Sequence, residues 1–127
     1  MPLVLVVEDR PTDRELLVDL LDNSGYELLE SETAEEAVRL ALEWKPDLVI
    51  ADMLVPEMDG LDLARAVRAN PAIAQTPIML YTAADELWEL ERLAHAAGVS
   101  LVLRKPADPR EVLSAVESLV DGTSTST

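Results

Sequence analysis

The feature that most constrains the fold of this sequence is a regular alternation between short apolar runs and longer segments with helical spacing. The short runs are rich in Val, Ile and Leu, and their length is typical of buried strands. The segments between them carry apolar residues three and four positions apart, as amphipathic helices do. The short runs lie at residues 3–7, 26–29, 48–51, 78–81 and 101–103, the second being the weakest.

Strands that alternate with helices predict an α/β fold with a parallel sheet, helices on both of its faces and right-handed crossovers. We expect five strand–helix units, (βα)₅, in a doubly wound flavodoxin-like sheet with the strand order 2-1-3-4-5. The runs at 48–51 and 78–81 are continuously apolar, which fits burial on both faces. One domain over residues 1–121 is expected, followed at 122–127 by a polar disordered tail or linker stub.

Composition excludes several classes of site. The sequence has no cysteine and a single histidine, so disulfides, thiolate metal sites and multi-histidine metal clusters are excluded. A net charge of −15 disfavours direct contact with nucleic acid. No apolar run has the length needed to span a bilayer, and residues 2–7 lack the basic flank of a signal peptide. We therefore expect a soluble, cytoplasmic domain that binds neither membrane nor nucleic acid.

Polar residues lie at the ends of four of the apolar runs: Glu8 and Asp9, Asp52, Thr82, and Lys105 after Arg104. In an open parallel sheet, ligands bind beyond the carboxyl ends of the strands. The first and third strands would be neighbours about 4.8 Å apart, so we expect Glu8, Asp9 and Asp52 to converge. Lys105 would start roughly 10 Å from Asp52, a gap that an extended lysine can largely cover.

Three converging carboxylates need a compensating cation, and an all-oxygen set without Cys or His favours Mg²⁺. A carboxylate beside Mg²⁺ and a lysine is equipped to attack phosphorus and form an aspartyl phosphate. The metal and the ammonium group would stabilise charge on the transferring oxygens. The Thr82 hydroxyl could then donate to the phosphate of the product.

Each of these residues also has a structural interpretation. Glu8 and Asp9 could supply negative charge near the start of a helix, and Lys105 could be a solvated surface lysine. Their shared position at one sheet edge favours the functional interpretation. For Thr82, a purely structural role as a helix N-cap stays open.

Four segments in order, VVEDRPTD, ADMLVPEMDG, PIMLYTAAD and LRKP, together resemble the receiver domain of two-component response regulators. The resemblance covers essentially the whole chain. It implies that Asp52 accepts a phosphoryl group from a histidine kinase or a histidine phosphotransfer protein. It further implies that Glu8, Asp9, Asp52 and the backbone carbonyl of Leu54 hold Mg²⁺.

The resemblance also implies Thr82 as the switch hydroxyl, Lys105 as the phosphate-binding lysine and a cis bond between Lys105 and Pro106. Pro56 and Gly60 would shape the loop after the acceptor. The chain would be a signalling switch that catalyses only its own phosphorylation and dephosphorylation. Phosphorylation would change the surface of the fourth helix, fifth strand and fifth helix, which a downstream effector reads, in a monomer or a phosphorylation-linked homodimer.

Two alternatives belong to other classes. A degenerate receiver would serve as a constitutive interaction module, although the intact Asp52 and Lys105 argue against it. A phosphatase of the haloacid dehalogenase type would need the pattern DxDx[TV] on its first strand, which VVEDRPTD does not fit.

The sequence departs from the receiver pattern at Val102, where receivers usually carry Tyr or Phe. Tyr81 is expected to point to the other face of the sheet, so we do not interpret it as a replacement. The switch would then run through Thr82 and the loop that follows it, with Trp88, a half-buried helix residue, reporting on it. Leu54 and Ala84 cannot orient water by hydrogen bonding, which predicts slow autodephosphorylation.

Overall fold

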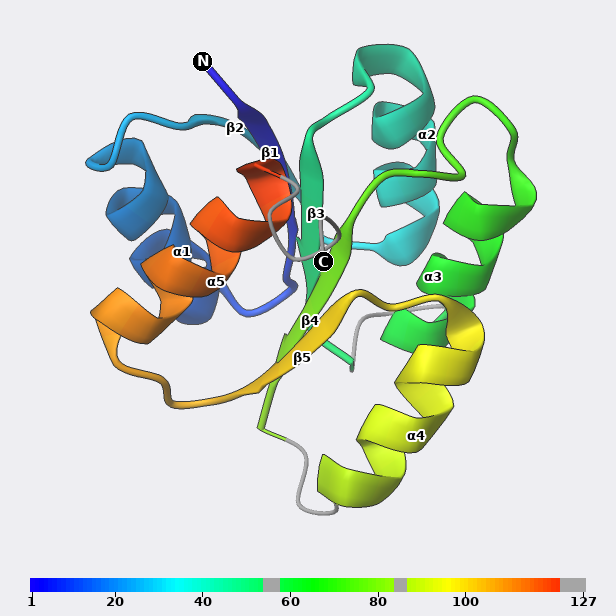
Figure 1. The fold of residues 1–127 in the computed structure, drawn as a ribbon. Helices are drawn as coiled ribbons and strands as arrows, with labels where there is room; N and C mark the ends of the chain where they lie inside the picture. Colours follow the sequence, from blue (N-terminus) through cyan, green and yellow to red (C-terminus); the bar gives the residue numbers. More distant parts are fainter. Residues whose placement is uncertain (54–57, 84–86, 122–127) are drawn as a thin grey trace.

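The computed structural model describes residues 1–53, 58–83 and 87–121, except for the side chain of Leu87. Strands and helices alternate along these residues as the sequence predicts (Figure 1). The strands are β1 (Leu3–Val7), β2 (Glu27–Ser31), β3 (Leu48–Ala51), β4 (Ile78–Thr82) and β5 (Leu101–Arg104). The helices are α1 (Pro11–Asp22), α2 (Ala34–Trp44), α3 (Gly60–Ala69), α4 (Leu87–Ala97) and α5 (Pro109–Asp121). In the described part of the chain, no helix has both the length and the apolar character needed to cross a membrane.

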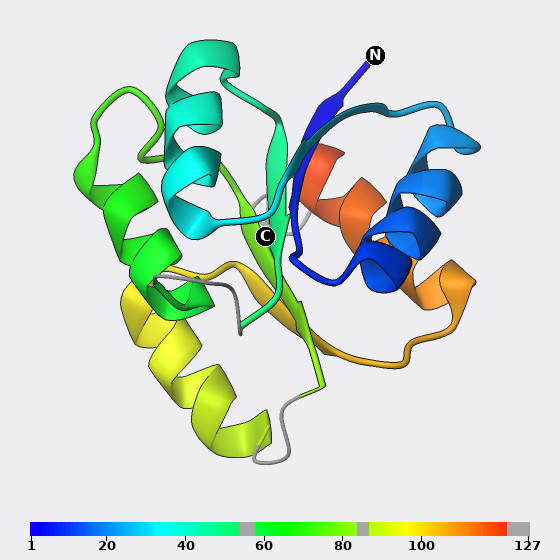
Figure 2. The ribbon, with the colours of Figure 1, turned by 180° about the vertical axis from the view of Figure 1, so that it is seen from behind.

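The strands form one parallel sheet in the order β2-β1-β3-β4-β5, which confirms the predicted topology. Helices α1 and α5 cover one face of the sheet, and α2, α3 and α4 cover the other (Figures 1 and 2). The carboxyl ends of all strands therefore open onto one edge, from which the connections to the helices start.

Side-chain alternation along the strands divides the core into two layers. Leu5 of β1 and Val49 of β3 pack with α2, α3 and α4, whereas Val6 and Ile50 pack with α1 and α5. All four residues of β3 are buried, as its continuous apolar run predicts. A strand buried on both faces holds the residue at its end, Asp52, in a rigid frame.

Each strand begins at the first residue of its predicted run except β2. The run at 26–29 predicts a strand that begins at Tyr26, but β2 begins at Glu27. The backbone N–H of Tyr26 donates to the carbonyl of Leu21 at 3.2 Å, so this residue closes the turn after α1. The N–H of Glu27, which donates to the carbonyl of Pro2, is the first to join the sheet.

Local sequence signals position α2 and α3. The Thr33 hydroxyl accepts a hydrogen bond from the Glu36 N–H at 3.1 Å, and the Asp59 carboxylate accepts one from the Asp62 N–H at 2.8 Å. Both side chains cap a helix by accepting from an otherwise unpaired N–H group. Gly60, the first residue of α3, lies so close to the sheet that a Cβ atom would come within 3.1 Å of the Asp52 carbonyl oxygen. The glycine thus lets α3 start directly beside the end of β3.

The exposure of Trp88 corrects an expectation. Trp88 was expected to be half-buried, but its side chain is 72% exposed in the first turn of α4, and Trp44 at the end of α2 is 55% exposed. Both helices bury alanines against the sheet, among them Ala41 and Ala94, whereas the two tryptophans stand on the outer faces.

Candidate functional site

The carboxyl edge of the sheet brings five polar side chains together. Glu8 directly follows β1, Asp52 follows β3, Thr82 ends β4 and Lys105 follows β5. Asp13 joins them from the first turn of α1. β1 and β3 are apolar up to this edge, so Glu8 and Asp52 emerge where the core ends.

The Lys105 ammonium group lies at the centre of the site. Its Nζ donates to Glu8 Oε1 at 2.6 Å, to Asp52 Oδ2 at 2.9 Å and to Asp13 Oδ2 at 3.1 Å. Burial alone would lower the pKa of Lys105, but the hydrogen bonds and negative charges of the carboxylates outweigh it and raise the pKa above its ordinary value. The lysine is therefore held in its charged form.

Asp52 is held at both of its carboxylate oxygens. Oδ1 accepts a hydrogen bond from the Thr82 hydroxyl at 3.1 Å, while Oδ2 accepts from Lys105. Its backbone N–H donates to the carbonyl of Val7 at 3.1 Å, which extends the pairing of β1 and β3 by one residue. The side chain is 11% exposed, so the carboxylate is fixed in orientation but still reaches the surface.

Glu8 is the most deeply placed acid of the site, with 4% of its surface exposed. Burial raises the pKa of Glu8, and the hydrogen bonds from Lys105 and from the Arg10 N–H oppose this shift only in part. An acid with a raised pKa in a protein interior is one whose charge is incompletely compensated. The site can therefore accept more positive charge than Lys105 supplies.

The donor set suits a hard divalent cation. Carboxylate oxygens of Glu8, Asp13 and Asp52 all lie within 4.8 Å of one another. Together with Lys105 these groups carry a net charge of about −2 when ionised, which a divalent ion would balance. A set made of oxygen atoms alone favours Mg²⁺ over softer metals.

The structure brings most of the predicted site residues together, but not Asp9. Glu8, Asp52, Thr82 and Lys105 come together. Asp9 does not join this cluster: its side chain is exposed and, among the described residues, makes no hydrogen bond or ion pair. Asp13 takes the third position instead, and the role of Asp9 as a magnesium ligand stays a prediction.

Sequence reasoning missed Asp13, although a signal was present. Asp13 follows Asp9 by four residues, and Pro11 between them is typical of a helix start. An acid in the first turn of the helix that follows β1 lies near the same sheet edge as the end of β1. The peptide bond between Lys105 and Pro106 is cis, as the resemblance implied. Leu54, Pro56 and Ala84 lie outside the described residues, so their predicted roles stay predictions.

Val102 and Tyr81 lie on opposite faces of the sheet. Val102 is partly buried against the core layer of α2, α3 and α4, whereas Tyr81 packs on the side of α1 and α5. This confirms the predicted orientation of Tyr81. Its ring is nevertheless close to the site, with its centroid 5.4 Å from Lys105 Nζ.

Comparisons with known proteins agree with this geometry. The response regulator receiver domain family matches residues 4–117. The chain is 32% identical over 117 residues to the alkaline phosphatase synthesis transcriptional regulatory protein PhoP of Bacillus subtilis, covering 92% of this chain and 48% of that protein. It is 36% identical over 118 residues to the transcriptional regulatory protein ResD of the same organism, covering 92% and 47%. The chain thus spans about half the length of these curated relatives.

Solved structures show the same likeness over nearly their whole length. A putative response regulator from Chloroflexus aurantiacus superposes with a TM-score of 0.89 at 31% identity, covering 94% of this chain and 98% of that one. The receiver domain of the sensor histidine kinase PA1611 from Pseudomonas aeruginosa, described with a magnesium ion coordinated in its active site cleft, gives 0.86 at 26% identity, covering 94% and 98%. The family match, these neighbours and the acidic edge with its lysine together show that the chain belongs to the receiver domain family of two-component response regulators.

Proposed function

We propose that Asp52 accepts a phosphoryl group from a histidine kinase or a histidine phosphotransfer protein, and that the chain acts as a phosphorylation switch. As a receiver domain it is a signalling module and not an enzyme that turns over a free substrate. We further propose that residues of this chain catalyse the transfer of the phosphoryl group to Asp52.

The geometry of Asp52 carries this proposal. The carboxylate is held at the surface by a hydroxyl donor on one oxygen and an ammonium donor on the other. In the transfer, one Asp52 oxygen bonds to phosphorus while the phosphorus–nitrogen bond of the donor phosphohistidine breaks, and that electron pair returns to the imidazole. Lys105 and Thr82 are placed to donate to the phosphoryl oxygens as charge develops on them.

The acids beside Asp52 support the proposal of a bound Mg²⁺. Glu8 and Asp52 would hold the ion together with Asp13, or with Asp9 and the Leu54 carbonyl as the family resemblance implies. When bound, the ion neutralises charge on the oxygens of the transferring phosphoryl group. The magnesium ion of the Pseudomonas aeruginosa receiver supports this assignment by analogy.

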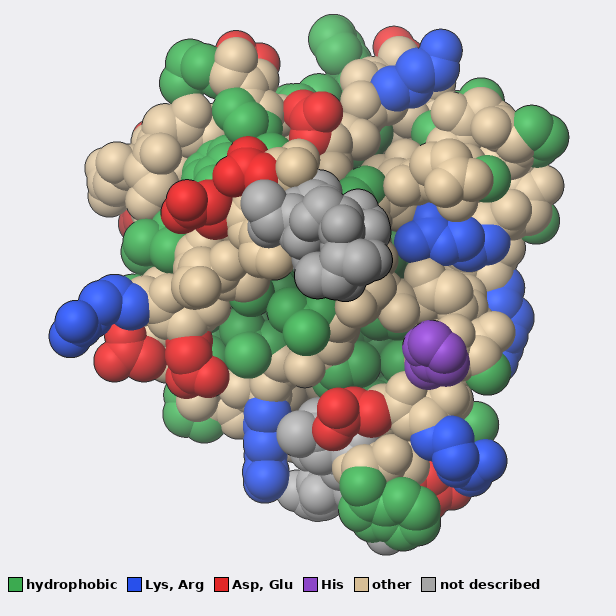
Figure 3. Space-filling view, viewed as in Figure 1, with side chains coloured by type: hydrophobic (Ala, Val, Ile, Leu, Met, Phe, Trp, Pro, Cys, Tyr) green, Lys and Arg blue, Asp and Glu red, His purple; other side chains and the backbone are tan. Residues whose placement is uncertain are grey.

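The effector surface is proposed to lie over α4, β5 and α5. Trp88, Leu93 and Leu101 expose 72%, 39% and 37% of their surface. On this side of the molecule, Figure 3 shows hydrophobic side chains at the surface near β5 and near the start of α4. Apolar groups of this kind suit a protein partner, or a second copy in a phosphorylation-linked dimer, better than nucleic acid.

The decisive experiment is phosphotransfer from a panel of histidine kinases to the wild type and to Asp52→Asn. We expect Mg²⁺-dependent labelling of the wild type and none of Asp52→Asn. Labelling of neither protein by any kinase, with an effector bound equally by both, would instead identify a constitutive interaction module.

The proposal includes slow loss of the phosphoryl group. Leu54 and Ala84 lack side-chain groups that could orient an attacking water by hydrogen bonding. We expect a phosphoryl lifetime well above that of receivers with amide or acidic side chains at these positions. A half-life of seconds in the purified, phosphorylated protein would contradict this expectation.

A further inference from the structure

We propose that Tyr81 is a positioning residue for Lys105. Its ring holds the ammonium group beside Asp52, and its hydroxyl contacts the segment that runs from Lys105 to the start of α5, here called the β5–α5 connection. The inference rests on the proposed function, since it concerns the same lysine. Tyr81 itself is an aromatic residue outside the acidic site.

The first observation is the contact between the ring and the ammonium group. The Tyr81 centroid lies 5.4 Å from Lys105 Nζ, within the range of a cation–π interaction. The Lys105 side chain is 15% exposed, and an interaction of this type strengthens as water is removed. The ring thus adds an uncharged partner to an ammonium group that otherwise contacts carboxylates.

The second observation is the order of residues along β4. Thr82 donates to Asp52, and the residue before it, Tyr81, contacts Lys105 from the opposite side of the sheet. Two consecutive residues therefore contact the two partners of one ion pair. Because β4 is hydrogen-bonded between β3 and β5, it fixes both contacts relative to each other.

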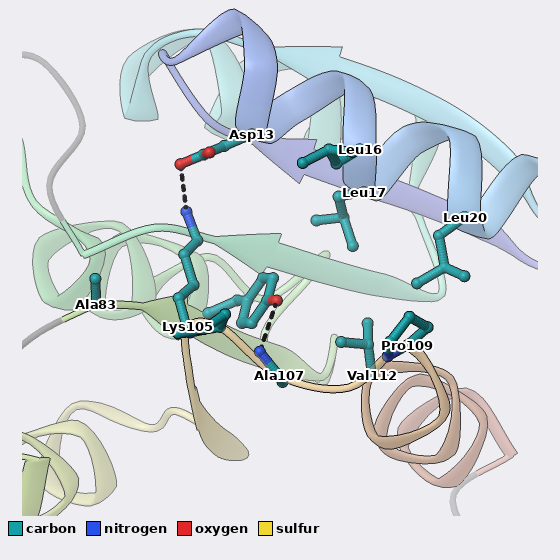
Figure 4. Close-up of a pocket in the computed structure, with 11 residues that line it drawn as sticks. Asp13, Leu16, Leu17, Leu20, Ala83, Lys105, Ala107, Pro109 and Val112 are labelled. Carbon is teal, nitrogen blue, oxygen red and sulfur yellow. Dashed lines mark hydrogen bonds and ion pairs between the residues drawn. The ribbon is translucent and has the colours of Figure 1, made fainter.

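The third observation concerns the Tyr81 hydroxyl. The N–H of Ala107 donates to it at 3.4 Å, two residues after Lys105 and two residues before α5 begins (Figure 4). The same side chain therefore contacts the site with its ring and the β5–α5 connection with its hydroxyl. A shift of Lys105 toward a phosphoryl group would alter both contacts of Tyr81.

The Lys105 side chain borders a cavity, so it lacks packing partners on one side. Lys105 and Tyr81 both line a cavity of about 420 Å³ between α1 and α5, with Asp13 at one end and Leu17 and Val112 on its walls (Figure 4). A long flexible side chain beside a cavity loses packing on that side and keeps more rotamer freedom. The Tyr81 ring offsets part of this loss, whereas Val102 on the other face cannot.

The test is a double-mutant cycle on the full chain: wild type, Tyr81→Leu, Lys105→Met and the double variant. Phosphorylation rates are measured with saturating acetyl phosphate and Mg²⁺, per folded molecule. We expect Tyr81→Leu to be slower by about three- to tenfold, the size of a lost cation–π contact. In the Lys105→Met background the same substitution should cause no further slowing. Equal slowing in both backgrounds, or none in either, would overturn the inference.

Two variants separate positioning from simple packing. Tyr81→Phe keeps the ring and should keep the wild-type rate, while the chemical shift of the Ala107 amide changes with the loss of its acceptor. Tyr26→Leu removes another half-buried tyrosine from the same core layer and should leave the rate unchanged. If Tyr26→Leu slows the reaction as much as Tyr81→Leu, the effect is one of packing and the inference fails.

The cycle also separates this inference from the proposed function. If wild type and Asp52→Asn both remain unphosphorylated, the proposed function fails. The four proteins of the cycle are then compared by urea unfolding in the absence of metal. Coupling between Tyr81 and Lys105 in the free energy of unfolding supports the contact, and strictly additive effects overturn it.

Discussion

Two partly buried cations lie at opposite edges of the sheet and have different roles. Arg68 lies where β4 and β5 begin, and Lys105 lies where β5 ends. Arg68, in the last turn of α3, donates to the main-chain carbonyls of Gly98, Ala74 and Thr76 at 3.0, 3.0 and 2.6 Å. These carbonyls belong to the connections that lead into β4 and β5. Lys105, at the end of β5, donates to three carboxylates.

Because their partners differ, the pKa values of the two cations shift in opposite directions. Burial lowers the pKa of Arg68, because neutral carbonyls compensate its charge only in part. At Lys105 the carboxylates outweigh burial and raise the pKa. A cation held by carbonyls ties segments of the chain together, whereas one held by an excess of acids can share them with a metal ion. The comparison separates a structural edge from a reactive one.

The sharpest test of this comparison is Lys105→Met, which keeps the length of the side chain and removes its charge. We expect the phosphorylation rate to fall by about 100-fold or more, because a donor to the developing phosphoryl charge is lost. The rate is measured with a small phosphodonor at saturating Mg²⁺. A loss of only a few-fold would place Lys105 outside the reaction.

The matched substitution at the other edge is Arg68→Met. It leaves three main-chain carbonyls without their donor, which we expect to lower the free energy of unfolding by about 2–3 kcal/mol. The measurement is urea unfolding, and the phosphorylation rate per folded molecule should equal that of the wild type. A slowed reaction in folded Arg68→Met would remove the distinction between the two edges.

The sequence was most informative where an apolar run meets a charged residue. β1 and β3 have the predicted bounds because Glu8 and Asp52 follow directly after their last buried residues. β4 and β5 extend one residue beyond their predicted runs, since the backbones of Thr82 and Arg104 still pair although their side chains are polar. The α/β alternation predicted a parallel sheet, and the expected strand order 2-1-3-4-5, which the structure confirms, brought Asp52, Thr82 and Lys105 together.

What the sequence did not predict depends on where side chains reach in space. Asp13 was missed because helical spacing does not say which way the first turn of α1 faces. For Tyr81, alternation gave the correct face, but not that Lys105 extends close enough to meet its ring. Both misses involve the long side chain of Lys105, whose end point depends on partners from several elements.

A substitution at Asp13 tests whether its carboxylate contributes to the negative charge that binds Mg²⁺. We expect Asp13→Asn to bind Mg²⁺ about tenfold more weakly, because a negative charge within a few ångströms of the ion is removed while the side-chain shape is kept. Calorimetry measures the affinity. Asp19→Asn, an exposed change of the same charge on the same helix, is the control and should bind as the wild type does.

Asp9→Asn in the same series decides between the two acids. If Asp9→Asn weakens Mg²⁺ binding and Asp13→Asn does not, the family-implied ligand is the functional one, and Asp13 serves only to pair with Lys105 in the metal-free protein. If both weaken binding, the two acids contribute together.

The smallest expected effect is a pH dependence that only the reactive edge should show. The pKa of Glu8 is raised above its ordinary value of 4.5, chiefly by burial. The folded protein therefore keeps this proton at pH values where the unfolded chain has lost it. In that window, from 4.5 up to the folded pKa, the Glu8 contribution to the free energy of unfolding falls as the pH rises.

Unfolding of the metal-free wild type and of Glu8→Gln across this window isolates the effect, because all other groups titrate in both proteins. We expect the stability of the wild type relative to Glu8→Gln to decline with rising pH. Arg68→Met should retain the wild-type slope, since the contacts of Arg68 involve no acid. A wild-type slope equal to that of Glu8→Gln would mean that Lys105 already compensates the Glu8 charge in full. The excess negative charge that distinguishes this edge would then have to reside on Asp13 and Asp52 alone.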